Sequence, residues 1–317
     1  MAKPPGRRTL AVQLSKRANV LYLEHARVLQ KDGRVLYLTE SGSPVEQFFN
    51  IPEKNTAFLM LGKGTSITDS AARKLAEANV VVGFCGSGGS PLFGSVDIAF
   101  LNSQSEYRPT EYMQRWVKMW FDDDARLAGA KALLRKRLRL TLESWSASQV
   151  LTERRIGLPD RLLHAFDSEI GAAPDAEALL LAEARWAKQL YGLLAAGFRL
   201  DDFKREESKD SRETKADVVN GFIDHGNYIA YGFAAVALNG LGISFSLPLL
   251  HGKTRRGALV FDLADLVKDA VVLPLAFSSG AAKWRQQEFR NELIDRCQAV
   301  GMLDMLFDFA ISVVEKS

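Results

Sequence analysis

The spacing of hydrophobic positions changes near residue 102, and this change divides the chain into two parts. Before it, apolar residues fall in short runs bounded by turn residues, a pattern typical of β-strands. One helical pattern interrupts these runs, with small or apolar residues at Ala71, Ala72, Leu75 and Ala76. The expected strands are Val20–Glu24, Ala26–Gln30, Arg34–Thr39, Val45–Ile51, Thr56–Leu61, Val80–Cys85 and Gly94–Phe100. We therefore predict a small, mostly antiparallel β domain that carries one helix.

After Asn102 the apolar positions recur every three or four residues, which is the spacing of amphipathic helices. The expected helices are 109–120, 124–148, 161–170, 175–198, 217–239, 262–277, 283–300 and 303–314. Between two of them, Arg199–Lys215 has almost no apolar residue and is expected to be a mobile loop. The sequence thus predicts an α+β fold, with an N-terminal β domain at residues 1–102 and a large all-α C-terminal domain at residues 103–317.

The composition is that of a soluble globular protein, because 47% of the 317 residues are hydrophobic and 25% are charged. The net charge of +3 is too small to indicate a nucleic-acid partner by itself. Cys85 and Cys297 match neither a metal-binding spacing nor a disulfide framework, so we expect a reducing, cytoplasmic location. No signal peptide or membrane span is expected from the apolar runs. The glycine-rich loops at 62–66 and 83–89 match no phosphate-binding motif, and no nucleotide site is expected.

Positive charge gathers between Asp124 and Glu143, where the sequence has no acidic residue. A run of this kind is most often a solvated helix face. A merely soluble helix, however, interleaves Glu with Lys, so the one-signed run also fits a polyanion such as DNA. A second excess of cations follows His251. The side chains expected to contact DNA phosphates are Arg126, Lys131, Arg135 and Arg139 in the helix and Lys253, Arg255 and Arg256 in the loop.

The stretch from Leu249 to Phe277 contains a histidine and two closely spaced carboxylates, His251, Asp262 and Asp265. Spacing alone favours a structural interpretation, in which Asp262 caps a helix and Asp265 completes the capping arrangement, both stabilised by the helix dipole. The alternative is that residues three apart place both carboxylates on one helix face, where the preceding loop brings the imidazole. Oxygen ligands with one imidazole suit Mg²⁺ or Mn²⁺.

A metal site would be expected to take a further carboxylate from elsewhere, and Glu183 is the candidate. Its neighbours at helical spacing, Leu179, Ala182 and Trp186, are apolar, which places Glu183 near the edge of a buried face. A partly buried acid needs a cation, and a metal ion would supply one. From the residues alone, the capping and the metal interpretations both stay open.

Six segments, in this order along nearly the whole chain, carry a resemblance to a known family. They are SKRANVLYLEHARVL, NTAFLMLGKGTSIT, VVVGFCGSGGSPLF, SEYRPTEYMQRWVKMWF, GFIDHGNYIAYG and the stretch from Leu249 onward. The chain resembles the CRISPR-associated integrase, the universal nuclease and integrase of spacer acquisition, and is most similar to its type I-F branch. Each segment is weak evidence alone, but six in order are strong.

The resemblance implies a metal site and its ligands. Glu183 lies in a Glu-Ala-Arg segment, His251 precedes a Gly-Lys loop, and Asp265 ends the D-x-A-D part of D-x-A-D-x-x-K, as in the family. These three residues would bind Mn²⁺ or Mg²⁺. Asp262 would be a catalytic neighbour that helps hold the geometry, and Asn227 matches a family position beside the site.

The resemblance also implies an activity and partners. The 3′-hydroxyl ends of a captured double-stranded DNA fragment would be joined to the CRISPR repeat by transesterification. Two copies would dimerise through the N-terminal domain, and a small ferredoxin-like partner, fused in the type I-F branch to a helicase-nuclease, would bridge two dimers. Two alternatives stay open. One is a metal-dependent endonuclease that cuts branched DNA with water as nucleophile, and the other is a non-enzymatic DNA-binding scaffold in which Asp262 and Asp265 are only caps.

Overall fold

The computed structural model describes residues 17, 19–39, 47–84, 110–200, 203–206, 214–252 and 257–315. These residues group into two compact units, one ending at Gly83 and the other beginning at Phe84. Several sequence predictions lie outside the described residues: the strand at 94–100, most of the loop at 199–215, Cys85, and the cations Lys253, Arg255 and Arg256.

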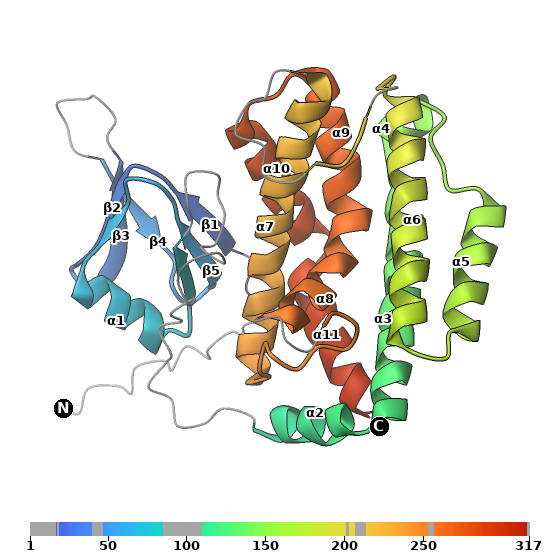
Figure 1. The fold of residues 1–317 in the computed structure, drawn as a ribbon. Coiled ribbons are helices and arrows are strands. Elements are labelled where there is room, and N and C mark those ends of the chain that lie inside the picture. The colour runs from blue at the N-terminus through green and yellow to red at the C-terminus, as the bar shows by residue number, and fades with distance from the viewer. Residues whose placement is uncertain are drawn as a thin grey trace. The chain divides into compact units, whose positions relative to one another are not determined.

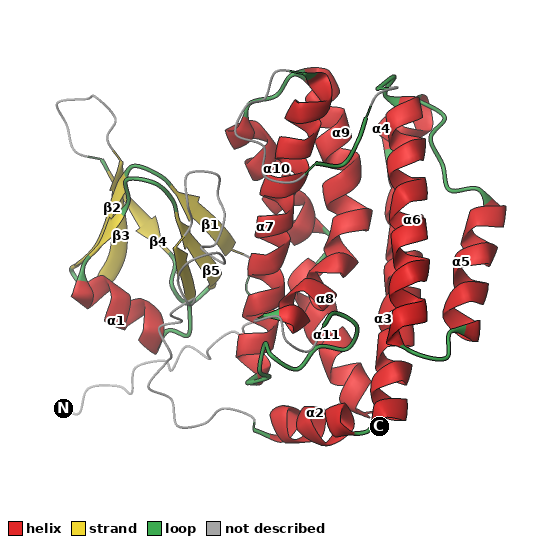
Figure 2. Ribbon diagram, viewed as in Figure 1, coloured by secondary structure: helices red, strands yellow, loops and turns green. Residues whose placement is uncertain are grey.

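The N-terminal unit contains two sheets (Figure 1, Figure 2). The first has the strand order β1-β5-β7, with bounds β1 Asn19–Leu23, β5 Thr56–Leu61 and β7 Val81–Phe84. The second has the order β4-β3-β2-β6, with bounds β4 Phe48–Ile51, β3 Arg34–Thr39, β2 Ala26–Lys31 and β6 Ser66–Ile67. The antiparallel prediction holds for the neighbours of β3 but is wrong for β1 with β5 and for β2 with β6, which run parallel. Alternating hydrophobicity predicts a strand but says nothing of its direction, which depends on the path of the connection.

The one helix predicted in this unit is confirmed as α1 (Asp69–Glu77). Thr68 caps it by accepting a hydrogen bond from the backbone N–H of Ala71 at 3.4 Å. Ala71 and Leu75 are buried against the strand residues of the unit's hydrophobic core. The residues of that core all belong to the N-terminal unit.

The second unit is helical, which confirms the predicted α+β fold class (Figure 2). Its elements are α2 Glu111–Phe121, α3 Asp123–Ala147, α4 Gln149–Glu153, α5 Asp160–Ala172, α6 Ala176–Gly197, α7 Lys215–Leu241, α8 Ala258–Val267, the π-helix η2 Lys268–Val272, α9 Leu273–Ala282, α10 Gln286–Ala299 and α11 Met302–Glu315. The short α4 was not predicted. Among the described residues no single helix is long and apolar enough to cross a bilayer, and only the pair α10 and α11, bent by 55°, meets that test by length and composition.

Packing between the helices of this unit positions the site. Helix α7 is buried along most of its length and packs against α8, α9 and α11. Helix α3 packs against α8 and η2, while α5 packs against α3 and α6 (Figure 1). The side of α3 that faces η2 therefore meets side chains from α6 and α8 in the interior of the unit.

The helix that was expected to begin at Asp262 begins four residues earlier, at Ala258. Gly257, with a φ of 76°, ends the loop in the left-handed conformation that glycine adopts without strain. The apolar residues Ala258, Leu259 and Val260 then form a buried first turn rather than the end of a loop. Asp262 and Asp265 consequently lie inside the helix, and the capping interpretation is wrong for both.

Candidate active site

Three potential ligands from three separate segments converge in the helical unit. Glu183 comes from α6, His251 from the loop before α8, and Asp265 from α8 itself. Each offers one oxygen or nitrogen atom, and these atoms all lie within 4.8 Å of one another. The sequence proposed these three residues together, and the structure brings them together.

Asp262 holds the loop that carries the histidine. Its side chain is 0% exposed and accepts hydrogen bonds from the backbone N–H groups of Leu249 at 2.7 Å, Leu250 at 3.1 Å and His251 at 3.1 Å. The same carboxylate lies 2.6 Å from Nδ1 of His251. If Nδ1 donates to it, Nε2 is the nitrogen left to bind an ion, as in many carboxylate–histidine–metal arrangements. Asp262 thus fixes the imidazole. Its role as a catalytic neighbour stays a prediction.

Two tryptophans of α2 hold the preceding part of this loop. The indole N–H of Trp116 donates to the carbonyl of Leu247 at 3.0 Å, and that of Trp120 donates to the carbonyl of Pro248 at 2.9 Å. Both hydrogen bonds pair backbone carbonyl groups of a loop, where helical hydrogen bonds are not available. The position of His251 is therefore set by packing on α2 as well as by Asp262.

Arg137 of α3 is a residue that sequence reasoning missed. It belongs to the cationic run that was expected to face DNA, but its side chain is 4% exposed and points into the site. It donates to Oε1 of Glu183, to Oδ2 of Asp265 at 3.5 Å, and to both oxygens of Asp269 at 2.6 and 3.1 Å. The available signal was its place on an apolar face, three residues after Leu134 and four before Thr141, both buried.

Asp269 lies in η2, a single π-helical turn inside the long helix formed by α8 and α9. The backbone N–H of Leu273 donates to Lys268 rather than to Asp269, and Pro274 has no N–H to offer Ala270. The carbonyls left over are paired from α3 instead: Trp145 donates to Asp269 at 2.9 Å and Ser144 donates to Ala270. The π-turn is therefore stabilised by its contact with α3.

The pKa values show how closely charges of both signs are packed. Burial alone would raise the pKa of Asp265, but Lys268, whose Nζ lies 2.6 Å away, and Arg137 hold it well below its usual range. Burial raises the pKa of Glu183, although Arg137 acts in the opposite direction. Burial would lower the pKa of His251, but its bond to Asp262 and the nearby charge of Asp265 raise it.

The charged side chains of the site leave a net negative charge that one divalent cation would neutralise. Four carboxylates, those of Glu183, Asp262, Asp265 and Asp269, stand against two cationic side chains, Arg137 and Lys268. With a neutral imidazole this leaves two negative charges in excess. An oxygen-rich set with one imidazole and this net charge fits a hard divalent ion such as Mg²⁺ or Mn²⁺.

Of the other cations expected to meet DNA, Lys131, Arg135 and Arg139 lie away from the buried face of α3 that carries Arg137. Lys131 donates to the carbonyl of Gly171 at 3.1 Å, and Arg135 forms an ion pair with Asp167 of α5 at 3.2 Å. Arg126 pairs with Asp123 and lies 5.5 Å from the ring of Trp120. Arg139 is exposed. Arg126 is the exception, because its side chain is only 16% exposed and donates to the backbone carbonyl of Trp120 at 3.0 Å. Contact of the four residues with DNA stays a prediction.

Asn227, expected beside the site, lies on α7, the helix that packs against α8. Its Oδ1 is buried and accepts no hydrogen bond from any residue that the structure describes. A buried amide oxygen without a partner is uncommon, since most such groups are paired with protein or water. The side chain of Asn227 can therefore accept a further hydrogen bond. Its place beside the three potential ligands stays a prediction.

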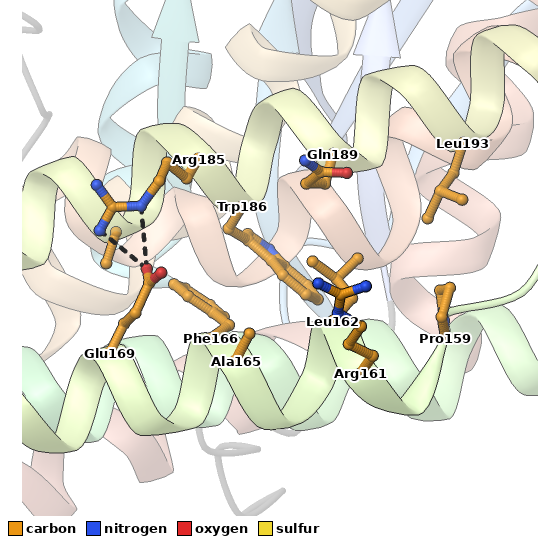
Figure 3. A pocket seen from close by; sticks show the side chains of 11 residues that line it. Pro159, Arg161, Leu162, Ala165, Phe166, Glu169, Arg185, Trp186, Gln189 and Leu193 are labelled. Atoms are coloured by element: carbon orange, nitrogen blue, oxygen red, sulfur yellow. Dashed lines mark hydrogen bonds and ion pairs between the residues drawn. The ribbon is translucent and has the colours of Figure 1, made fainter.

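A cavity of about 460 Å³ lies between α5 and α6 (Figure 3). Arg185 spans its rim to reach Glu169 at 3.0 Å, and the rings of Phe166 and Trp186 stack with centroids 4.6 Å apart. The indole N–H of Trp186 also donates to Oδ2 of Asp269 at 2.9 Å. Trp186, which lines this cavity, therefore also holds Asp269, the partner of Arg137.

Comparison with known proteins gives consistent matches over almost the whole chain. Residues 21–298 match the family described as CRISPR associated protein Cas1. A CRISPR-associated endonuclease Cas1 from Pseudomonas aeruginosa is 45% identical over 311 residues, covering 96% of this chain and 94% of the relative. A relative of the same name from Pectobacterium atrosepticum is 44% identical over 310 residues, covering 95% of this chain and 94% of its own. Among solved structures, a casposase bound to its integration product superposes with a TM-score of 0.72, covering 94% of this chain and 91% of the casposase at 14% identity.

Proposed function

Because the chain belongs to the Cas1 family of CRISPR-associated endonucleases, we propose that it integrates DNA through a metal ion held by Glu183, His251 and Asp265. The reaction is the joining of the 3′-hydroxyl ends of a captured DNA fragment to the CRISPR repeat by transesterification. The observation that carries the proposal is the convergence of three ligand atoms within 4.8 Å of one another. The resemblance identified from sequence motifs, including its six ordered segments, agrees with this family membership.

The residues of the chain supply the binding and orientation. Mg²⁺ or Mn²⁺, when bound, lowers the pKa of a hydroxyl and offsets charge that develops on the phosphate. Asp262 fixes the imidazole of His251 through the hydrogen bond at Nδ1. Lys268, beside Asp265 and 5.2 Å from the ring of Tyr231, adds a fixed positive charge next to the ligands. The site is thus held in shape by residues that need not touch the ion.

Double-stranded DNA is the proposed substrate, both as captured fragment and as repeat. The casposase among the similar structures is bound to an integration product, which supports the same kind of substrate here. The N-terminal unit is the proposed dimerisation surface, and a small ferredoxin-like protein, fused to a helicase-nuclease, is the proposed bridging partner. A cytoplasmic location follows from this role.

A second candidate function is cleavage of branched DNA with water as the nucleophile. We keep this second candidate because the similar proteins from Pseudomonas and Pectobacterium are named endonucleases. The same ligands would serve, because hydrolysis and transesterification differ only in which oxygen attacks the phosphorus. A scaffold without catalysis is disfavoured, since Asp262 and Asp265 lie inside α8 and do not cap it.

The deciding experiment mixes the purified protein and its bridging partner with a DNA fragment that has free 3′-hydroxyl ends and a supercoiled plasmid that carries a repeat. Metal-dependent joining that is lost in Glu183→Ala and in Asp265→Ala is the expected result. Glu177→Ala, an exposed glutamate on the same helix α6, is the matched control and should retain joining. Cutting without joining would favour the nuclease, and unchanged activity in both folded variants would refute the site.

A further inference from the structure

We propose that Arg137 is the internal counter-ion of the site, a positioning residue that holds the metal ligands together before any metal binds. The inference rests on the proposed metal site and goes beyond it, because it assigns the preformed geometry to a cation that belongs to the chain. Arg137 does not act on DNA or on the reacting atoms. It acts through Glu183 and Asp265, both of which accept from its Nη1.

The contacts of Arg137 divide into an anchor and a bridge. Its Nε and Nη2 donate to the two oxygens of Asp269 at 2.6 and 3.1 Å, which is a bidentate pair. Its Nη1 donates to Glu183 and lies 3.5 Å from Asp265, so a single nitrogen links two of the three ligands. Only the planar fork of a guanidinium reaches three carboxylates in one plane of donors, which a lysine ammonium cannot reproduce.

The anchor is itself fixed, so the bridge has a defined position. Asp269 also accepts from the indole of Trp186 at 2.9 Å, and its backbone carbonyl accepts from Trp145. The carboxylate of Asp269 is 2.6 Å from Arg137 but is not among the three ligands that converge. A carboxylate that belongs to no ligand set and is held by an indole N–H is suited to orient the arginine.

Electrostatics explain why such a cation is needed. Glu183, Asp265 and Asp269 are side chains that are at most 13% exposed, and like charges this close in a low-dielectric interior repel one another. Without a central cation the carboxylates would turn apart or one would take up a proton. Arg137 keeps the carboxylates of Glu183 and Asp265 together, within reach of the imidazole of His251.

Arg137 and a metal ion thus offset the same negative charge, and this overlap gives a measurable signature. If Arg137 is replaced by an uncharged residue, the metal-free protein should lose stability. Adding a metal ion should then raise the stability of the variant by more than it raises that of the wild type. A residue that contributes only packing would lower stability by the same amount with and without metal, since ligand binding then adds a constant increment.

The test uses circular dichroism to measure melting temperatures in EDTA and in saturating MnCl₂. Arg137→Met, which keeps a similar stem and removes the charge, should lower Tm in EDTA by roughly 10 °C, with at least about half of that loss restored by Mn²⁺. Leu134→Ala, on the same buried face of α3, is the matched control: it leaves a cavity of comparable cost and should show the wild-type Mn²⁺ shift. Arg137→Lys should fall between Arg137→Met and wild type.

Two results would overturn the inference. One is an Mn²⁺ shift in Arg137→Met no larger than that in Leu134→Ala. The other comes from a metal-free measurement: Arg137→Met combined with Asp269→Asn removes one charge of each sign and should regain part of the Tm lost in EDTA, and no regain would contradict a counter-ion role. If the wild type shows no Mn²⁺ shift and no Mn²⁺ binding by calorimetry, the proposed metal site fails, and the double variant still decides the role of Arg137.

Discussion

The two faces of α3 carry the same kind of residue in opposite environments. Arg135 and Arg137 are two positions apart, and the helical turn sends the first to the surface and the second to the interior. Arg135 meets Asp167 with both side chains about half exposed, at 47% and 56%. Arg137 meets three carboxylates with 4% of its own side chain exposed.

This difference separates charges that can serve an external partner from charges that serve the fold. Exposed ion pairs contribute little to stability, because water screens them and the long side chains lose entropy. Burial would lower the pKa of Arg137, but Asp269, Asp265 and Glu183 raise it well above its usual range, so it stays charged inside the protein. A count of basic residues along α3 treats the two arginines alike, whereas the structure assigns them to different tasks.

Removal of the buried anchor should give the largest effect on stability. Asp269→Ala leaves Arg137 without its bidentate partner and the indole of Trp186 without its acceptor. Breaking a buried pair on one side typically costs about 3–5 kcal/mol, and we expect a loss of this size in urea unfolding. Asp295→Ala, a substitution on α10 away from this cluster, is the control and should change stability by less than about 0.5 kcal/mol. A loss in Asp269→Ala as small as in this control would remove the contrast between the two faces.

Loss of the indole hydrogen bond alone should give a smaller change. Trp186→Phe keeps a ring to stack on Phe166 but no longer donates to Asp269. Hydrogen bonds to charged groups contribute about 1.5–3 kcal/mol, so we expect a destabilisation of roughly 2 kcal/mol by chemical denaturation. Trp284→Phe, at a partly exposed position before α10, serves as comparison. Equal losses of stability in the two variants would show that the hydrogen bond to Asp269 contributes no stability beyond that of ring packing.

The sequence predicted the ligands better than the residues that support them. Glu183, His251 and Asp265 each stood in a recognisable local pattern, so a resemblance along the chain connected them. Arg137 and Asp269 were missed because their partners are distant in sequence: Arg137 is 46 positions from Glu183 and 132 from Asp269. A buried arginine and a surface arginine look the same in a run of cations, and only the apolar spacing around Arg137 distinguishes them.

The fold shows the same limit in another form. Hydrophobic spacing predicted most strands and helices within a few residues, because local burial determines that spacing. It did not give the parallel pairing of β1 with β5, nor the π-turn of η2, because both depend on contacts with distant segments. The start of α8 was misplaced because Ala258, Leu259 and Val260 fit a buried loop end and a first helical turn equally well.

The outer face should matter for DNA and little for stability. Replacing Arg135 and Arg139 together with Ala removes two exposed cations of α3. If both contact phosphates, the slope of log affinity against log salt should flatten by about 2, and affinity for duplex DNA should fall several-fold at low salt, measured by fluorescence anisotropy. A slope equal to that of the wild type would take this face out of the DNA-binding surface.

The smallest expected effect is that of Asp167→Asn, which removes the acidic partner of Arg135 and nothing from the interior. Stability should change by less than about 1 kcal/mol, because the pair is exposed on both sides. DNA affinity should rise slightly at low salt, since the neutral amide at this position would neither hold Arg135 nor repel phosphate. Urea unfolding and anisotropy on one preparation measure both quantities. A large loss of stability with no gain in affinity would mean that the surface pair stabilises the fold as the buried cluster does, and the contrast between the two faces of α3 would then be wrong.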